Sequence, residues 1–182
     1  MELTREETSR WVGTWATIPS PVEGVALNNQ TIRMVAHVSI GGQRLRVRLS
    51  NAYGLRKLEI GSAHVAWRAE GPGIVPGSDR PLTFNGSASA TIAVGALLVS
   101  DEVEFDLAPL SNLVISVHLP GDLPENFVIT GHGNAHQTNY ISPAGDFTAA
   151  AVMPVARTTE DFLIVSAVDV LAPPDTGGIV AF

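Results

Sequence analysis

Glycine and proline are spread so densely along this chain that few stretches could hold a helix of average length, about 11–12 residues. The 182 residues include 17 glycines and 12 prolines. Strand-favouring residues are abundant between these breaks, with 20 valines, 11 isoleucines and 13 threonines. Short, regularly spaced strands separated by turn residues are typical of a β-sandwich or jelly roll. The sequence therefore predicts an all-β fold, a jelly-roll-like β-sandwich of about 10–12 strands with little helix.

Strands are expected wherever an apolar or alternating run lies between two turn signals. One run contains Ser100-Asp101 and is expected to split into two strands there. No internal repeat and no low-complexity tract is found. The expected strands cover residues 11–17, 30–40, 44–50, 58–67, 82–84, 90–94, 97–107, 113–119, 127–130, 137–142 and 162–170.

A two-residue turn signal at Gly41-Gly42 predicts a β-hairpin, because glycine adopts the positive φ angles that such turns require. If Ile40 pairs with Gln43, six apolar residues share one face of the hairpin, so its register agrees with the hydrophobic pattern. The expected cross-strand pairs on that face are Val38 with Leu45, Ala36 with Val47, and Met34 with Leu49.

The opposite face of the same hairpin is basic, because it carries Arg33, Arg44, Arg46 and Arg48. A second stretch, residues 102–107, alternates three acidic residues with apolar ones. Both stripes fit solvated strand faces joined by cross-strand ion pairs. The alternative is that the arginine stripe docks a partner, since a planar guanidinium binds carbonyl and carboxylate groups in fixed geometry.

The net charge of −7 argues against several kinds of partner. An acidic chain binds nucleic acid poorly, because a basic surface is needed to neutralise phosphates. The chain also lacks a Lys/Arg-rich amphipathic stretch, and its apolar runs are shorter than a membrane-spanning helix. We therefore expect neither nucleic acid nor a membrane as a partner. The charged first residues contain no signal peptide, so the cytoplasm is the default compartment, or the exterior if a leader was removed.

Motifs for catalysis and for cofactor binding are absent. The chain has no cysteine, which excludes disulfides, thiol catalysis and Cys-based zinc sites. It has neither a G-x-S-x-G nucleophile elbow nor a glycine-rich phosphate loop. Ser78 lies in a proline-bracketed stretch that favours a turn. His132 and His136 have the spacing of metal ligands on a helix, but flanking glycines disfavour a helix, so no metal and no cofactor is expected.

Two other features have more than one interpretation. Trp11 and Trp15 are four residues apart, which in a regular strand places both on one face. They form either a sugar-binding platform or a core or interdomain contact. The densest polar stretch, residues 130–140, is either an internally bonded loop or the wall of a site, because buried polar groups need partners.

A series of short motifs, in consistent order, resembles one family. The chain is similar, over essentially residues 11–182, to the N-terminal β-domain of two-domain SGNH (GDSL-type) hydrolases, which are esterases and lipases mainly from bacteria. The motifs are Trp11-Val-Gly-Thr-Trp-Ala16, Asn29-Gln-Thr-Ile-Arg33, Val38-Ser-Ile-Gly-Gly42, Arg46-Val-Arg-Leu-Ser-Asn-Ala-Tyr-Gly54, Pro76-Gly-Ser-Asp-Arg80, Val99-Ser-Asp101, Gln137-Thr-Asn-Tyr140 and Gly145-Asp146.

The C-terminal residues agree with this resemblance. Gly177-Gly-Ile-Val-Ala-Phe182 is typical of a strand buried on both faces, as in a parallel α/β sheet. In the family a similar strand is followed at once by the Gly-Asp-Ser block of the nucleophile. The resemblance implies three parts: an N-terminal extension at 1–10, a β-sandwich accessory domain at 11–172, and at 173–182 a linker and first strand leading into an SGNH hydrolase domain absent from this chain.

The implied function is that of a non-catalytic accessory domain that docks onto the hydrolase domain and shapes access to it. The expected partner is that hydrolase domain, in cis in the parent protein. The chain alone is expected to lack esterase activity, because the nucleophile, base and oxyanion blocks are missing. A free-standing carbohydrate-binding jelly-roll module and a structural or oligomerisation domain stay open, as does self-association through the C-terminal end.

The docking surface is expected where the last strand leaves the sandwich. The polar loop is expected beside that strand, and the end of the arginine stripe is the second candidate. In the sugar-binding alternative, Trp11 and Trp15 form the platform. The candidate partner-facing residues are His132, Asn134, His136, Gln137, Thr138, Asn139, Tyr140, Arg46, Arg48, Asn51, Ile179 and Phe182.

Overall fold

The computed structural model describes residues 9–174 and 176–177. These residues form sixteen strands and no helix, so the prediction of an all-β fold is confirmed. There are more strands than the roughly 10–12 expected, because several strands are only two or three residues long. The expected break at Ser100-Asp101 is present. Residues 178–182, which hold most of the expected C-terminal strand, and residues 1–8 of the expected extension lie outside the described residues.

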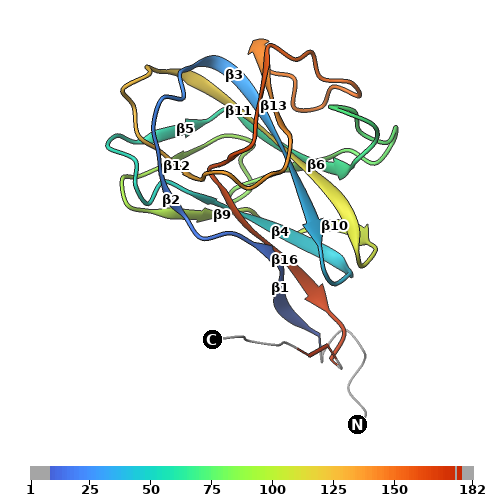
Figure 1. The fold of residues 1–182 in the computed structure, drawn as a ribbon. Coiled ribbons are helices and arrows are strands. Elements are labelled where there is room, and N and C mark those ends of the chain that lie inside the picture. Colours follow the sequence, from blue (N-terminus) through green and yellow to red (C-terminus); the bar gives the residue numbers. More distant parts are fainter. Residues whose placement is uncertain (1–8, 175, 178–182) are drawn as a thin grey trace.

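Two antiparallel sheets face each other and enclose the core, as in a β-sandwich (Figure 1). The first sheet has the order β1 (Arg10–Ala16), β16 (Val165–Ala172), β4 (Gly42–Ser50) and β10 (Val103–Leu107), and β9 (Leu97–Val99) also pairs with β4. The second sheet has the order β14 (Arg157–Thr159), β13 (Asn139–Ala144), β3 (Leu27–Val38), β11 (Ser111–Leu123), β6 (Ser62–Trp67) and β7 (Arg80–Leu82). A small three-stranded sheet has the order β15 (Phe162–Leu163), β12 (Ile129–His132) and β2 (Ser20–Val22). A two-stranded sheet pairs β5 (Leu58–Ile60) with β8 (Ala90–Ile92).

The predicted hairpin at Gly41-Gly42 is wrong. β3 pairs with β11 and β13, whereas β4 pairs with β16, β10 and β9, so the chain crosses between the two sheets at this point. The six apolar residues expected on one face are nevertheless all fully buried. Both strands turn their apolar face toward the same core, so hydrophobic alternation identifies the inward face but not the neighbouring strand.

Close backbone approach, rather than turn conformation, explains the two glycines at this crossing. Neither Gly41 nor Gly42 has a positive φ angle. A Cβ atom on Gly41 would overlap the carbonyl oxygen of Leu107, and one on Gly42 would lie 2.7 Å from that of Leu171. Any larger residue would therefore push β4 away from the ends of β10 and β16.

Arg33 does not belong to the arginine stripe, which corrects the second part of the hairpin prediction. It lies in the second sheet and is completely buried, with 0% relative accessibility. Its guanidinium donates to Ser116 Oγ and to four backbone carbonyls in the segments that cover this sheet. Burial lowers the pKa of Arg33 to about 10, and the charge of Asp79 partly opposes this shift. The accepting carbonyls belong to Pro72, Phe147, Thr148 and Ala150.

Candidate functional site

The two described ends of the chain meet at one end of the first sheet. The start of β1 lies beside the end of β16 (Figure 1). Arg10 of β1 pairs with Ala172, the last residue of β16. The Arg10 guanidinium also donates a 2.6 Å hydrogen bond from Nη2 to the carbonyl oxygen of Thr176. The segment that follows β16 is therefore held against the start of β1.

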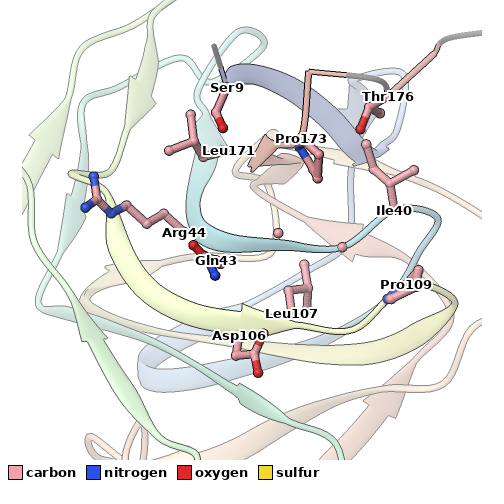
Figure 2. Close-up of a pocket in the computed structure, with 12 residues that line it drawn as sticks. Ser9, Ile40, Gln43, Arg44, Asp106, Leu107, Pro109, Leu171, Pro173 and Thr176 are labelled. Atoms are coloured by element: carbon pink, nitrogen blue, oxygen red, sulfur yellow. The ribbon is translucent and has the colours of Figure 1, made fainter. Parts of the chain in front are cut away.

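A groove of about 620 Å³ opens at this end, and we call it the terminal groove. Its volume falls within the ~300–1,000 Å³ that is usual for binding sites. Figure 2 shows the start of β4 running between two groups of side chains, one that includes Leu171 and Pro173 and one that includes Leu107 and Pro109. The terminal groove is lined by Ser9, Ile40, Gly41, Gly42, Gln43, Arg44, Asp106, Leu107, Pro109, Leu171, Pro173 and Thr176.

The chemistry of the terminal groove is mixed. Aliphatic and proline side chains form much of its wall, while Arg44 and Asp106 supply one charge of each sign. Apolar concave surface of this kind, edged by polar groups, is typical of a contact with another molecule or domain. The backbone packing at Gly41 and Gly42 lies within its floor, so the groove is built by the crossing from β3 to β4.

The arginine stripe is engaged in ion pairs within the chain. Arg46 Nε lies 2.9 Å and Arg48 Nη2 lies 2.7 Å from Asp169 Oδ2 on the neighbouring strand β16. The Asp169 side chain is only 4% exposed. Arg44 forms a 3.3 Å pair with Glu102, next to the acidic strand β10. The prediction of solvated faces joined by cross-strand ion pairs is confirmed for these residues.

Trp11 and Trp15 do not form a sugar-binding platform, which was one of the two interpretations of their spacing. A β-bulge between Gly13 and Trp15 shifts the register of β1 against β16. Trp11 consequently lies on the outer face of the sheet, where the Arg46 guanidinium sits 4.5 Å from its ring centroid. Trp15 packs against the core and against Phe162, with ring centroids 4.6 Å apart. The prediction that both share a face is wrong, because the extra residue of a bulge reverses the alternation.

The polar stretch 130–140 is mostly bonded within the chain. Asn139 is fully buried; its Oδ1 accepts from the Val35 amide and its Nδ2 donates to the Asp161 carbonyl. The Asn134 amide donates to Asp161 Oδ1, and the Gln137 amide group bonds only the carbonyl of its neighbour Thr138. These bonds support the interpretation as an internally bonded loop.

The other residues of this stretch have separate surroundings. His132 Nδ1 hydrogen-bonds the carbonyl of Ile18, while the highly exposed His136 lies 3.7 Å from Glu160. Tyr140 is buried in a small second core on the outer face of the second sheet. Thr138 is exposed. The two histidines therefore have different partners and do not converge.

The structure does not bring the polar loop to the terminal groove. The loop contacts Glu160 and Asp161, which precede β16, whereas the groove contains Leu171 and Pro173 at the far end of that strand. Eight residues of strand separate these points by about 25 Å. Ile179 and Phe182 lie outside the described residues.

Asn51 has a structural environment at the end of β4 that is remote from the groove. It is 1% exposed, and its Nδ2 donates to the carbonyls of Arg56, Ile92 and Ala93. A Cβ on Gly54 would overlap Asn51 Oδ1, so Gly54 is needed for this packing. Asn51 thus joins two surface loops rather than facing a partner.

Two serines lie near acids and histidines, and neither is arranged as a nucleophile. Ser78 Oγ donates to the Val75 carbonyl and accepts from the Trp67 amide, as expected for a turn residue. Ser62 Oγ donates 2.7 Å to Asp146 Oδ2, while His118 Nδ1 lies 3.8 Å from the same oxygen. In a catalytic triad the serine hydroxyl donates to a histidine, whereas Ser78 donates to a backbone carbonyl and Ser62 donates to the Asp146 carboxylate.

A second groove, missed by the sequence reasoning, lies beside the first and also has a volume of about 620 Å³. We call it the Trp67 groove. It forms where the edge strands β7 and β10 of the opposite sheets come together, and it shares Gln43, Arg44 and Asp106 with the terminal groove. The sequence alone did not predict it, because its residues come from four separate stretches of the chain.

Within the described part of the chain, no group of three or more His, Asp and Glu side chains is placed to hold a metal ion. The same residues contain no helix long and apolar enough to cross a membrane. Comparison with models of known protein families gives no match, and comparison with curated proteins also gives none.

Proposed function

We propose that this chain is a non-catalytic accessory β-domain that docks an SGNH (GDSL-type) ester hydrolase domain of bacterial type across the terminal groove and shapes access to it. The observation that carries the proposal is the position of the groove. It lies where β1 begins and β16 ends, next to the Arg10–Thr176 hydrogen bond. A domain that continues from β16 would meet this surface first.

The composition of the terminal groove supports this role. Leu171, Pro109 and Ile40 offer apolar area, whose burial stabilises a contact by about 25 cal/mol per Å². Arg44 and Asp106 add one hydrogen-bonding group of each charge.

This proposal revises the expected docking residues. Arg46, Arg48 and Asn51 are engaged within the chain, and the polar loop lies about 25 Å from the groove. The docking surface is therefore assigned to the terminal groove. The oligomerisation alternative requires a symmetric contact through this same surface, and ultracentrifugation of the chain alone would detect it as a dimer.

The test supplies this chain and the hydrolase domain as separate polypeptides and measures their binding by calorimetry. We expect Pro109→Glu and Leu171→Glu to weaken binding at least tenfold, about 1.4 kcal/mol, because each places a charge in the apolar wall. Val94→Glu, on an exposed loop outside the groove, is the matched control and should bind like the parent. No binding by the parent chain, or equal binding by all three variants, would overturn the proposal.

A further inference from the structure

The Trp67 groove lies beside the terminal groove and shares Gln43, Arg44 and Asp106 with it, but its other lining residues are its own. It opens at the side of the sandwich, between the edge of the first sheet at β10 and the edge of the second at β7. Its volume of about 620 Å³ is within the range usual for small-molecule binding sites, about 300–1,000 Å³. The groove is lined by Gln43, Arg44, Trp67, Ser78, Arg80, Glu104, Phe105 and Asp106.

Trp67 provides a rigid aromatic surface in this groove. It is half-buried and packs against the main core, and its ring lies 5.2 Å from that of Phe105 at an interplanar angle of 47°. Its backbone amide donates to Ser78 Oγ, and its carbonyl accepts from the Val75 amide. The ring is therefore held in place before any ligand arrives, which reduces the entropy lost on binding.

Polar groups surround this aromatic surface and are also positioned in advance. Arg80 Nη1 donates to the carbonyls of Gly77 and Asp79, at 3.0 and 2.8 Å. Arg44 is held by its ion pair with Glu102. Glu104 and Asp106 also line the groove, and both are exposed residues of the edge strand β10. The lining thus combines hydrogen-bond donors and acceptors with one aromatic side chain.

The charges of the lining select between classes of ligand. The positive charges of two guanidinium groups equal the negative charges of two carboxylates, so the net charge of the lining is zero and the groove favours neither an anion nor a cation. Charged walls also disfavour a purely apolar ligand, because the desolvated charges would lose their hydrogen bonds. A peptide strand is disfavoured as well, since the bulge between Glu104 and Leu107 and the edge acids interrupt pairing along β10.

We propose that the Trp67 groove binds a neutral saccharide. A sugar ring presents an apolar C–H face that packs on an indole, while its hydroxyl groups both donate and accept hydrogen bonds. The arginines would donate to hydroxyl oxygens, and the carboxylates would accept from hydroxyl groups. This site differs from the alternative platform at Trp11 and Trp15, two residues that the bulge in β1 separates onto opposite faces.

The experiment titrates the purified chain with neutral hexasaccharides of glucose, xylose, mannose and galactose, using calorimetry and tryptophan fluorescence. We expect at least one of them to bind with a Kd of about 0.1–1 mM. Arg80→Ala and Asp106→Ala change exposed side chains and should each weaken that binding roughly tenfold, about 1.4 kcal/mol. Trp67→Ala should abolish it, but this residue also packs on the core, so the two exposed variants decide.

Two controls make the result specific. Trp11→Ala removes the other outer tryptophan, and Glu59→Ala removes an exposed acid outside the groove; both should bind like the parent. The inference is overturned if no hexasaccharide binds at about 10 mM, or if Arg80→Ala and Asp106→Ala bind like the parent. Preference for an anionic oligosaccharide or for a peptide would also overturn it. None of these outcomes depends on whether a hydrolase domain docks at the terminal groove.

Discussion

Replacing Arg33 by methionine tests whether its hydrogen bonds hold the covering segments onto the second sheet. Methionine keeps an unbranched apolar stem and removes every donor of the guanidinium. The carbonyls of Pro72, Phe147, Thr148 and Ala150 and the hydroxyl of Ser116 would then lose their common partner. A buried acceptor left without a donor costs about 1–3 kcal/mol.

The net magnitude follows from two opposing contributions. Removing one member of a buried charged network usually costs about 3–5 kcal/mol. Burial disfavours the charged guanidinium, as its pKa of about 10 indicates, so removing it recovers part of that cost. Several of the acceptors are also only partly buried and can bond water. We therefore expect a loss of about 3 kcal/mol, or about 10 °C in Tm for a domain of this size.

Urea unfolding followed by tryptophan fluorescence measures this loss, with Arg56→Met at an exposed position as the control. Limited proteolysis should cut the variant within residues 69–79 and 145–153 before any other segment, because these carry the released carbonyls. Arg33→Lys should lower the free energy of unfolding at least as much as Arg33→Met, since one ammonium with three donors cannot reach all five acceptors. If the free energy of unfolding of Arg33→Met is less than about 1 kcal/mol below that of the parent, the Arg33 hydrogen bonds stabilise the fold far less than is usual for a buried charged network, and the reasoning is refuted.

Three further predictions concern other parts of the chain. Asp169→Asn should lower the free energy of unfolding by about 1–3 kcal/mol in urea titrations, because it leaves the charges of Arg46 and Arg48 facing each other, partly screened by solvent. Asp122→Asn changes an exposed residue and is the control. Equal stability of the two variants would contradict this prediction. Burial acts to raise the pKa of Asp146, but hydrogen bonds from Ser62 and from the amide and hydroxyl of Thr148, together with the His118 charge, lower it overall. The contribution of the ionised Asp146 to stability is therefore present above about pH 4, the pKa range of an unfolded aspartate, and is lost as pH falls through the lower folded value. Asp146→Asn should lower the free energy of unfolding by about 1 kcal/mol at pH 6 and by progressively less below pH 4. A stability difference between parent and variant that grows toward acid pH would be inconsistent with a lowered pKa. The purified chain should hydrolyse p-nitrophenyl acetate no faster than a heat-denatured sample, and activity abolished by Ser62→Ala or Ser78→Ala would show that a nucleophile had been overlooked.

Much of the strand pattern could be predicted from the sequence, because local residue preference and alternation act over a few residues. The expected runs at 30–40, 44–50 and 113–119 all lie within or overlap β3, β4 and β11. The short strands at Ser20–Val22 and Arg157–Thr159 were missed, because three residues carry too little pattern to distinguish a strand from a loop. Chain alternation likewise identified the buried face of β3 and β4 correctly.

Which strands become neighbours was decided by the tertiary structure. Gly41-Gly42 has the composition of a hairpin turn, yet the close approach of Leu107 and Leu171 makes it a crossing between sheets. The same effect moved Arg33 away from the arginine stripe and into a buried network. In each case the local sequence is compatible with both arrangements, and the packing of distant strands selects one of them.

The sequence by itself determined the all-β class, the inward faces of the long strands, the lack of catalytic motifs and the turn at Ser78, since each depends on residues close together in the chain. Only the tertiary structure decided the two grooves, the separation of Trp11 from Trp15 and the distance of the polar loop from the exit of β16. The grooves require edges of opposite sheets to meet, and the tryptophan faces depend on one bulge against β16. These features arise from contacts between residues far apart in the chain, which no local pattern records.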